Sequence, residues 1–384
     1  MAGWRRQWVE SLAREEGFAA AGIAAVPAPG SVEDREERER FADWIDEGRA
    51  GEMDYLKRRD EAGALVRSSV CVALPWARSV IVCAANYNVG QPRSTEPAPA
   101  GAGWIARYAW SSAGGRPSDY HKVLKRRLES LRERLEEAAG PFESRCFIDT
   151  GPVVERVYAR YAGIGWTGKN TCILNEKLGS WLFLGVIVTS LEAEPDAAGA
   201  TLSADRCGSC TRCIEACPTG ALTAARAMDA SRCISYLTIE KRGAIAEELR
   251  PLMGRQVFGC DICQDVCPWN RRAPIGMDPE LQPREELVNP ALDWLAAMDE
   301  CTWERWFNGS PVRRAKYSGF RRNVAIAMGN SGKAEFRPVL EAWSGEADPV
   351  VAEAAAWAAE RLAPDAAIET RSEMLGDTKA STGF

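Results

Sequence analysis

CGSCTRCIEACP, residues 207–218, is the stretch that decides how this 384-residue chain is built. Its four cysteines are spaced x2, x2 and x3 and are followed by a proline. This spacing is typical of bacterial ferredoxins, in which three close thiolates bind one 4Fe-4S cluster and the fourth binds a second cluster. The stretch therefore predicts an iron-sulfur protein that handles electrons.

A second run, CDICQDVCP at residues 260–268, lacks the first cysteine of the pattern because Val257 stands in its place. Cys233 lies between the runs and can fill that vacancy. Disulfide frameworks and zinc ribbons are the alternatives, but the first belong to short secreted chains and the second rarely use this spacing. The prediction gives one cluster Cys207, Cys210, Cys213 and Cys267, and the other Cys217, Cys233, Cys260 and Cys263.

The composition indicates a globular protein with two or three domains, since 46% of the residues are hydrophobic. No apolar run approaches the ~18 residues of a membrane span, and charged residues interrupt the region after Arg5 and Arg6 that an export signal would need. We expect a cytoplasmic protein. The net charge of -6 argues against nucleic-acid binding over the whole surface but allows a local basic patch.

His121 is the only histidine in the chain. A zinc site built on several histidines is therefore excluded, and so is an iron centre with two histidines and one carboxylate. A Ser-His-Asp triad could use only this residue.

Periodic apolar residues predict the main helices and strands. Alternating strands and helices indicate an α/β or α+β first domain. Ser118 is placed to cap the third helix. The expected helices cover 4–16, 32–46 and 119–138, the strands 79–84, 147–148 and 181–189, and the surface loops 91–103 and 111–117.

The sequence after residue 190 suggests a boundary and a helical C-terminal part. Segment 192–204 resembles a linker before the cysteine runs, and 321–330 and 350–362 look like two antiparallel helices of a repeat pair. The tail from 366 is polar and is expected to be loose.

GIGWTGKN at residues 163–170 nearly matches a phosphate-binding P-loop. Asn170 stands where a magnesium-binding hydroxyl should be, and no buried strand precedes the loop. Binding of a nucleoside triphosphate is therefore disfavoured. A loop around another anionic or amide-bearing cofactor and a simple tight turn both remain open.

Taken together, the motifs resemble those of epoxyqueuosine reductases over about residues 4–365. No single motif carries the resemblance. One departure is an insertion at 111–118, where family members have a short link. The matching segments are RY at 107–108, DYHKVL at 119–124, DTG at 149–151, AGIGW at 162–166, GKN at 168–170, GSW at 179–181, residues 207–220 and residues 259–270.

The resemblance implies an α+β multidomain fold. The expected parts are an N-terminal α/β cobalamin-binding domain at 1–197, a ferredoxin-like two-cluster domain at 198–280, a helical-repeat, HEAT-like segment that binds tRNA at 281–365, and a loose tail at 366–384.

The resemblance also implies an activity. The family reduces the epoxide of epoxyqueuosine at the wobble position of tRNA to queuosine, with a cobalamin and two 4Fe-4S clusters. Clusters only carry electrons, so a reducible centre must lie at the end of their path. We expect an external low-potential electron donor and a monomeric protein. The family match implies cobalamin contacts from Tyr108, Tyr120, His121, Gly165, Lys169, Asn170 and Ser180.

Asp149 matches the proton donor proposed for the family. Opening an epoxide leaves an alkoxide, which needs a proton when the carbon-oxygen bond breaks. A helix-capping role before residues 153–155 is the structural alternative.

Two basic runs are candidate tRNA contacts, because phosphates favour clustered arginine and lysine. A solvated face is the alternative for both. The first run follows the aromatic residues 303–307 and contains Arg313, Arg314, Lys316, Arg321 and Arg322; the second is Lys241 and Arg242.

Two other functions compete with tRNA modification. A corrinoid reductive dehalogenase would use the same cofactors, and a non-enzymatic iron-sulfur carrier could combine the clusters with a helical interaction module. Corrin binding would argue against the carrier, and tRNA binding against the dehalogenase.

Overall fold

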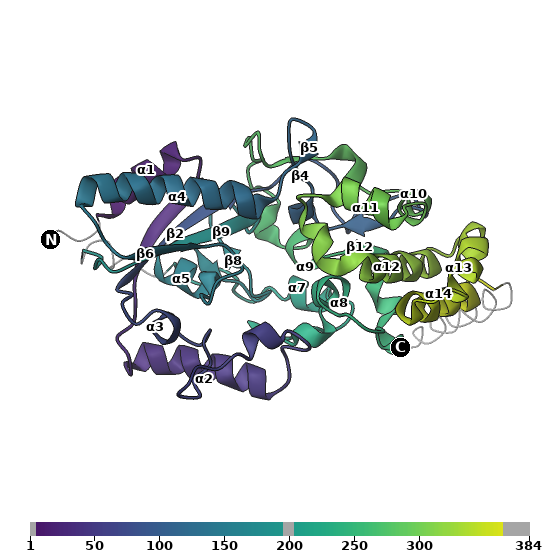
Figure 1. The fold of residues 1–384 in the computed structure, drawn as a ribbon, viewed down its shortest axis with the longest axis horizontal. Helices are drawn as coiled ribbons and strands as arrows, with labels where there is room; N and C mark the ends of the chain where they lie inside the picture. Colours follow the sequence, from purple (N-terminus) through teal and green to yellow (C-terminus); the bar gives the residue numbers. More distant parts are fainter. Residues whose placement is uncertain (1–4, 195–202, 364–384) are drawn as a thin grey trace, which may run out of the picture. The chain divides into compact units, whose positions relative to one another are not determined.

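The computed structural model describes residues 5–194 and 203–363 (Figure 1). It divides into two compact units. Unit 1 contains Met1–Thr95, Arg107–Cys233 and Asp261–Arg284, and unit 2 contains Glu96–Ala106, Ile234–Cys260 and Glu285–Phe384. The expected loose tail from 366 and most of the expected boundary at 192–204 lie outside the described residues.

Unit 1 is built on one four-stranded sheet with the order β1-β2-β9-β6. The strands are β1 (Ala20–Ala25), β2 (Ser79–Asn86), β9 (Leu182–Thr189) and β6 (Ser144–Phe147). Every pairing in this sheet is antiparallel. The unit is therefore α+β, which settles the choice that the alternating elements left open.

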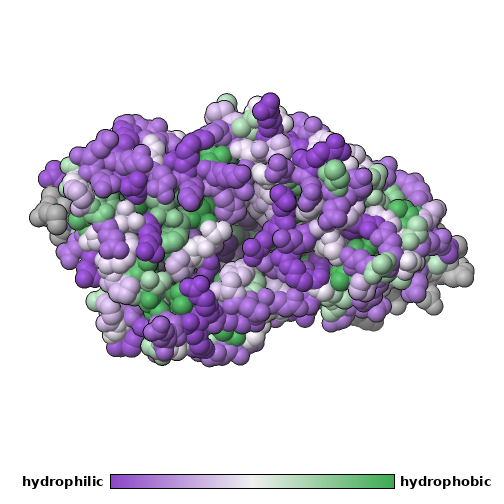
Figure 2. Space-filling view, in the orientation of Figure 1, coloured by the Kyte–Doolittle hydropathy of each residue, from purple (hydrophilic) through white to green (hydrophobic). Residues whose placement is uncertain are grey.

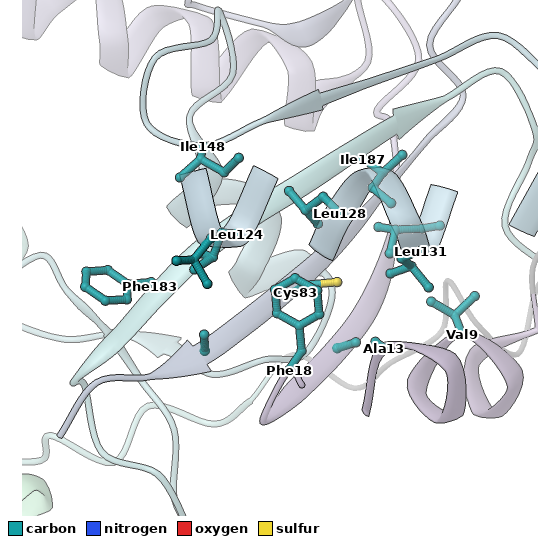
Figure 3. Close-up of a cluster of buried hydrophobic side chains, with 14 of the residues drawn as sticks. Val9, Ala13, Phe18, Cys83, Leu124, Leu128, Leu131, Ile148, Phe183 and Ile187 are labelled. Carbon is teal, nitrogen blue, oxygen red and sulfur yellow. The ribbon is translucent and has the colours of Figure 1, made fainter. Parts of the chain in front are cut away.

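Alternate residues of β2 supply two separate cores. Ile81 and Cys83 pack with α1 (Arg6–Glu15) and α4 (Tyr120–Ala139) in the core that Figure 3 shows. Val80 and Val82 pack with α5 (Glu155–Tyr161) and α3 (Val70–Ala73). Helices thus cover both faces of the sheet (Figure 1).

Helix α4 buries Leu124, Leu128, Leu131 and Leu135, at the spacing that predicted it. Its other side is hydrophilic (Figure 2). The cap is Asp119 and not Ser118, because the Asp119 side chain accepts a hydrogen bond from the backbone N–H of His121 at 3.0 Å. The Ser118 prediction was therefore wrong by one residue.

Residues 111–117 form a hairpin and not the expected loop. Strands β4 (Ser111–Ala113) and β5 (Arg116–Pro117) pair with each other, and β4 also pairs with β13 (Gln282–Pro283). Gly114 and Gly115 have φ values of 57° and 77°, so glycine allows the tight turn between the strands. The family insertion is thus an ordered addition to unit 1.

The remaining elements of unit 1 are short, apart from α2 (Val32–Asp46), which lies where the sequence predicted a helix. They are η1 (Asp54–Leu56), η2 (Arg107–Ala109), β7 (Trp166–Thr167), β8 (Ile173–Leu174), α7 (Arg212–Glu215), β10 (Leu222–Ala224), β11 (Ala227–Met228), η3 (Ala230–Arg232), α9 (Ile262–Asp265) and η6 (Pro268–Asn270).

Unit 2 is mainly helical. Its long helices, α12 (Lys316–Asn330) and α14 (Pro349–Arg361), contain both helices that the sequence predicted. They pack closely, since a Cβ on Gly329 would lie 2.8 Å from the Cβ of Ala358. The other elements are β3 (Trp104–Ile105), α8 (Ile234–Ile239), η4 (Glu247–Leu249), η5 (Pro251–Met253), β12 (Gln256–Phe258), η7 (Glu285–Leu287), α10 (Leu292–Ala296), α11 (Glu300–Phe307), η8 (Pro311–Ala315), η9 (Ala334–Phe336) and α13 (Arg337–Ser344).

Within residues 5–194 and 203–363, no helix has both the length and the apolar character needed to cross a bilayer.

Candidate functional site

Four of the predicted cluster ligands line one cavity in unit 1. The cavity has a volume of about 280 Å³, and its walls include Leu174 and Trp269. Cationic side chains of Lys169, Arg206 and Arg212 also line it. The four cysteines are Cys207, Cys210, Cys213 and Cys267, the set that the spacing assigned to the first cluster.

Short turns and helices present these thiols. Cys213 lies on α7, and the N–H of Cys210 donates to the carbonyl of Cys207 at 3.1 Å. Burial raises the pKa of the Cys267 thiol to about 11 and also raises that of Cys213. Since a cluster binds thiolates, loading it must release protons from these groups.

The cavity fits a cluster better than a single ion. In the described part of the chain, no three histidine, cysteine or acidic side chains converge on one metal position. A cubane differs because its four irons each take a separate thiolate, so the ligands surround a larger volume. The four thiols that line this cavity surround a volume of the kind that a cubane needs.

The four cysteines of the second predicted ligand set are divided between the two units. Cys217, Cys233 and Cys263 belong to unit 1, and Cys260 is the residue at which the preceding stretch of unit 2 ends. The Cys217 sulfur lies 3.8 Å from the Thr219 hydroxyl, and Cys263 hydrogen bonds to Cys172. No pattern in the sequence indicated this contact with Cys172.

The segment that resembles a P-loop forms hydrogen bonds to both cysteine runs. Lys169 Nζ donates to the carbonyl of Gly208 at 2.7 Å, and Asn170 Nδ2 donates to the carbonyl of Cys263 at 3.3 Å. Asn170 is buried. At Gly165, a Cβ would lie only 2.1 Å from the carbonyl oxygen of Leu174, so a side chain there is excluded. These contacts explain the residues of the loop without a phosphate.

Ser180 has a comparable role. Its hydroxyl accepts hydrogen bonds from Asn270 Nδ2 at 2.9 Å and from Gln264 Nε2 at 3.1 Å. The Ser180 N–H donates to Asn270 Oδ1 at 2.7 Å. Lys169, Asn170 and Ser180, expected at a cobalamin, therefore bond to the cysteine-bearing loops.

The other predicted site residues gather around Asp149, just after β6. Tyr120 donates its phenolic O–H to Asp149 Oδ2 at 2.5 Å, and His121 Nε2 lies 3.7 Å from the same oxygen. The Tyr108 ring meets the Tyr120 ring edge-on at 6.1 Å. Asp149 has a φ of 55°, an uncommon value for a residue with a side chain. A strained backbone holding a carboxylate is typical of functional sites.

Burial sets the protonation of the groups beside Asp149. It raises the pKa of Tyr120 well above the ordinary value, and the charge of Asp149 adds to this effect. Tyr120 therefore stays a neutral hydrogen-bond donor. Burial also raises the pKa of Glu155 to about 7, with a further contribution from Asp149. Neither Glu155 nor Asp119 was singled out from the sequence as a site residue.

Arg322 is a structural residue, so its prediction as a tRNA contact was wrong. It is 1% exposed, and its guanidinium donates to the carbonyls of Leu237, Lys241 and Gly243 inside unit 2. Arg321 is also mostly covered, since it bonds to Glu346 and stacks on Trp343 at 4.2 Å.

The two basic runs meet within unit 2. Arg242 donates to the carbonyls of Arg314 and Ala315 at 2.8 and 3.2 Å, and Arg314 bonds to Glu240 through two 3.0 Å contacts. Arg313 and Lys316 are exposed beside them. We call Lys241, Arg242, Arg313, Arg314 and Lys316 the basic surface of unit 2.

Comparison with known proteins matches the sequence of this chain to that of one family. A family model described as "4Fe-4S double cluster binding domain" matches residues 206–270, and one described as "Epoxyqueuosine reductase QueG, DUF1730" matches residues 67–150. The epoxyqueuosine reductase of Pseudomonas aeruginosa is 40% identical over 360 residues, which cover 92% of this chain and 94% of that protein. This chain belongs to the epoxyqueuosine reductase family.

Solved structures of epoxyqueuosine reductases are similar over the whole fold. One, in complex with an epoxyqueuosine-modified tRNA-Tyr stem loop, has a TM-score of 0.79 at 28% identity and covers 98% of this chain and 94% of its own. Another, from Bacillus subtilis, has its aspartate-containing catalytic loop swung out of the active site; its TM-score is 0.79 at 28% identity, with 98% and 95% covered.

Proposed function

We propose that this protein reduces the epoxide of epoxyqueuosine in tRNA to the alkene of queuosine. The similarity to epoxyqueuosine reductases over 92% of the chain carries the proposal. The tRNA stem loop bound by a structural relative supports the substrate class. The residues around Asp149 and the four-cysteine cavity supply the chemistry that this reaction needs.

The reaction is a two-electron reduction. One epoxide, two electrons and two protons give one carbon-carbon double bond and one water. Both carbon-oxygen bonds break, and the oxygen receives a proton at each cleavage. The protein must therefore deliver electrons to the carbon side and protons to the oxygen side.

The cofactors of the family are two 4Fe-4S clusters and a cobalamin, and the double-cluster match at residues 206–270 supports the first part. When bound, the clusters supply single electrons and the cobalamin a strongly reducing cobalt centre. We assign Cys207, Cys210, Cys213 and Cys267 to one cluster and Cys217, Cys233, Cys260 and Cys263 to the other. Lys169 and Asn170 orient the loops that carry these ligands.

We assign the proton donor to Asp149. Its carboxyl lies next to the side chains of Tyr120 and His121. Tyr108, Tyr120 and His121 remain the proposed residues of the cobalamin pocket in unit 1. The hydrogen bond from Tyr120 fixes the orientation of Oδ2. The Bacillus subtilis relative has a catalytic loop that contains an aspartate, which supports a catalytic role for an aspartate in this family.

The basic surface of unit 2 is the proposed tRNA contact. The protein carries a net charge of -6, so a polyanion binds best where cations are concentrated. The Arg242 guanidinium donates to the backbone carbonyl of Arg314, and the Arg314 guanidinium bonds to Glu240, so both side chains are held in a fixed arrangement. In the proposed layout, a repeat-like helical segment at 281–365 supplies Arg313, Arg314 and Lys316, and a two-cluster domain at 198–280 supplies Lys241 and Arg242. The third part is a cobalamin domain at 1–197.

Three expectations about partners and location accompany the proposal. The electron donor is an external low-potential reductant, since the clusters must be refilled twice in each turnover. The protein acts as a monomer. It works in the cytoplasm, where free thiols stay reduced.

The test is anaerobic turnover with defined components. The reconstituted protein, with cobalamin and a chemical reductant, is incubated with tRNA that carries epoxyqueuosine, and the digested nucleosides are analysed by mass spectrometry. Loss of one oxygen atom from the modified base supports the proposal. An unchanged nucleoside with fully loaded clusters and cobalamin would contradict it and would favour the electron-carrier alternative.

A further inference from the structure

The single histidine of the chain lies between two carboxylates. His121 Nδ1 is 2.8 Å from Asp119 Oδ1, and Nε2 is 3.7 Å from Asp149 Oδ2. Each ring nitrogen thus faces a different acidic side chain. Of the three, only Asp149 has a chemical step in the proposed function, where His121 is a contact of the cobalamin pocket.

The stoichiometry of the reaction requires that the proton donor be protonated again within each turnover. Two protons are consumed in each turnover, whereas one carboxylic acid carries one. After Asp149 has protonated the oxygen at the first bond cleavage, it is a carboxylate. It must be protonated again before it can serve at the second cleavage.

We propose that His121, oriented by Asp119, returns a proton to Asp149 within each turnover. In the imidazolium form, Nε2 gives its proton to the Asp149 carboxylate, and Nδ1 keeps its hydrogen bond to Asp119. The second carbon-oxygen cleavage then takes that proton and releases water. This inference rests on the proposed reduction of the epoxide.

The geometry suits such a transfer. Proton transfer needs a hydrogen bond of about 3 Å or one bridging water, and catalytic contacts are often longer before substrate binds. The 3.7 Å separation is longer than a direct hydrogen bond, so the transfer takes place through one bridging water or after the two side chains close up on the substrate. The His121 side chain is 31% exposed, so bulk water can return its proton.

Tyr120 keeps the three groups in register. Its ring stacks on the imidazole with the centroids 4.0 Å apart, while its hydroxyl donates to Asp149 Oδ2. Since its pKa is raised far above neutrality by burial, Tyr120 holds the carboxylate and supplies no proton. His121 is therefore the titratable nitrogen base next to the donor.

Several charges act on this pair. Asp119 and Asp149 face the imidazole. The charge of Lys122 acts on Asp119, and the charge of Asp149 acts on Glu155 and Arg156 of α5. A change of pH will titrate several of these groups, so a pH profile must be read beside a variant.

The test compares His121→Gln with wild type in anaerobic turnover, at saturating tRNA and over pH 6 to 9, with and without added imidazole. The expected result is a roughly 10- to 100-fold lower kcat with little change in KM. The wild-type decline toward high pH should disappear in the variant, and free imidazole should restore part of the rate. Asp119→Asn should give a smaller loss, because the amide oxygen can still accept the hydrogen bond from Nδ1 but carries no charge beside the ring.

Three outcomes would overturn the inference. They are a His121→Gln rate within about twofold of wild type at every pH, a slow variant with an unchanged pH profile, and a slow variant without imidazole rescue. Iron content and cobalamin spectra equal to wild type exclude misfolding as the cause. If wild type itself fails to reduce the substrate, the proposed function fails first.

A second readout is independent of turnover. Because His121 is the only histidine, its imidazole proton signals can be followed by NMR in tag-free protein with oxidised clusters. Asp149→Asn should move these signals at constant pH, since a carboxylate 3.7 Å from Nε2 is lost. Unchanged signals would mean that the two side chains are not coupled and would overturn the relay.

Discussion

The side-chain amide of Asn170 donates a hydrogen bond to the backbone carbonyl of Cys263 across 3.3 Å. One short segment thereby reaches the second cysteine run, while its neighbour Lys169 reaches the first run through Gly208. Both bonds end on backbone carbonyls within one residue of a proposed ligand. The segment can therefore set the shape of both cysteine loops.

Replacing Asn170 with alanine should loosen the loop at Cys263. The bond is partly buried, and a net hydrogen bond contributes about 0.5–1.5 kcal/mol. We expect lower iron content after purification and faster loss of cluster absorbance in air. Asn308→Ala, which removes an exposed amide, is the matched control. Equal cluster lifetimes in both variants would mean that the Asn170 contact does not matter for cluster retention.

The full chain should bind about eight irons, because two cubanes use all eight assigned cysteines. Cys233→Ala should damage mainly the cluster that also uses Cys217, Cys260 and Cys263, since the other keeps its four thiolates. EPR of the reduced variant distinguishes the two clusters. Loss of the signal from the cluster in the four-cysteine cavity, or about four irons in fully reconstituted wild type, would refute the crossed assignment.

The parts of the fold that depend on local pattern could be predicted. The leucine spacing gave α4, and β-branched residues gave β2. The cysteine spacing gave a ligand set that lines one cavity. Rules based on neighbouring residues failed where two adjacent residues could both cap a helix, as Ser118 and Asp119 could. The backbone conformation decides which side chain reaches the free N–H groups.

Contacts between distant segments could not be predicted. Tyr120 meets Asp149 only because the start of α4 lies beside the end of β6. Arg322 belongs to a charge run that usually marks a solvated face, yet the carbonyls of residues 237–243 bury it. A charge pattern in one segment carries no information on acceptors that another segment supplies.

Asp149→Asn should keep cobalamin and tRNA binding but nearly abolish turnover. An amide can still accept the Tyr120 hydrogen bond, but it cannot deliver a proton to the leaving oxygen. Loss of a general acid typically lowers the rate by ~10²–10⁴. Single-turnover rates measure this loss directly, and binding assays provide the control. A rate within about twofold of wild type would assign Asp149 to a structural role.

Glu155 should make stability depend on pH. Burial, with the charge of Asp149, raises its pKa from 4.5 to about 7, so the folded protein binds a proton that the unfolded chain releases in this range. Its contribution to stability is therefore present at low pH and is lost as the pH rises toward 7. Glu155→Gln should be more stable than wild type at pH 8, by about 3 kcal/mol at most.

The comparison of thermal midpoints at pH 5.5 and pH 8 tests this dependence. The stabilisation should shrink at pH 5.5, where wild-type Glu155 is largely protonated in the folded state. Glu143→Gln replaces an exposed carboxylate and should change neither midpoint. A Glu155→Gln effect of the same size at both pH values would show that titration of this carboxyl does not cause it.

Neutralising Arg313, Arg314 and Lys316 together should weaken tRNA binding and flatten its salt dependence, while the clusters and cobalamin stay bound. Each lost phosphate contact should reduce the slope of log affinity against log salt by roughly 0.7–0.9. Part of the Arg314 charge already pairs with Glu240, so its share should be the smallest of the three. Turnover of the isolated modified nucleoside, which has no phosphate backbone, should change little. Neutralising Arg35, Arg38 and Arg40 of the acid-rich helix α2 is the matched control and should leave the slope unchanged. If the two triple variants bind tRNA with the same salt slope, the basic surface of unit 2 is only a solvated face.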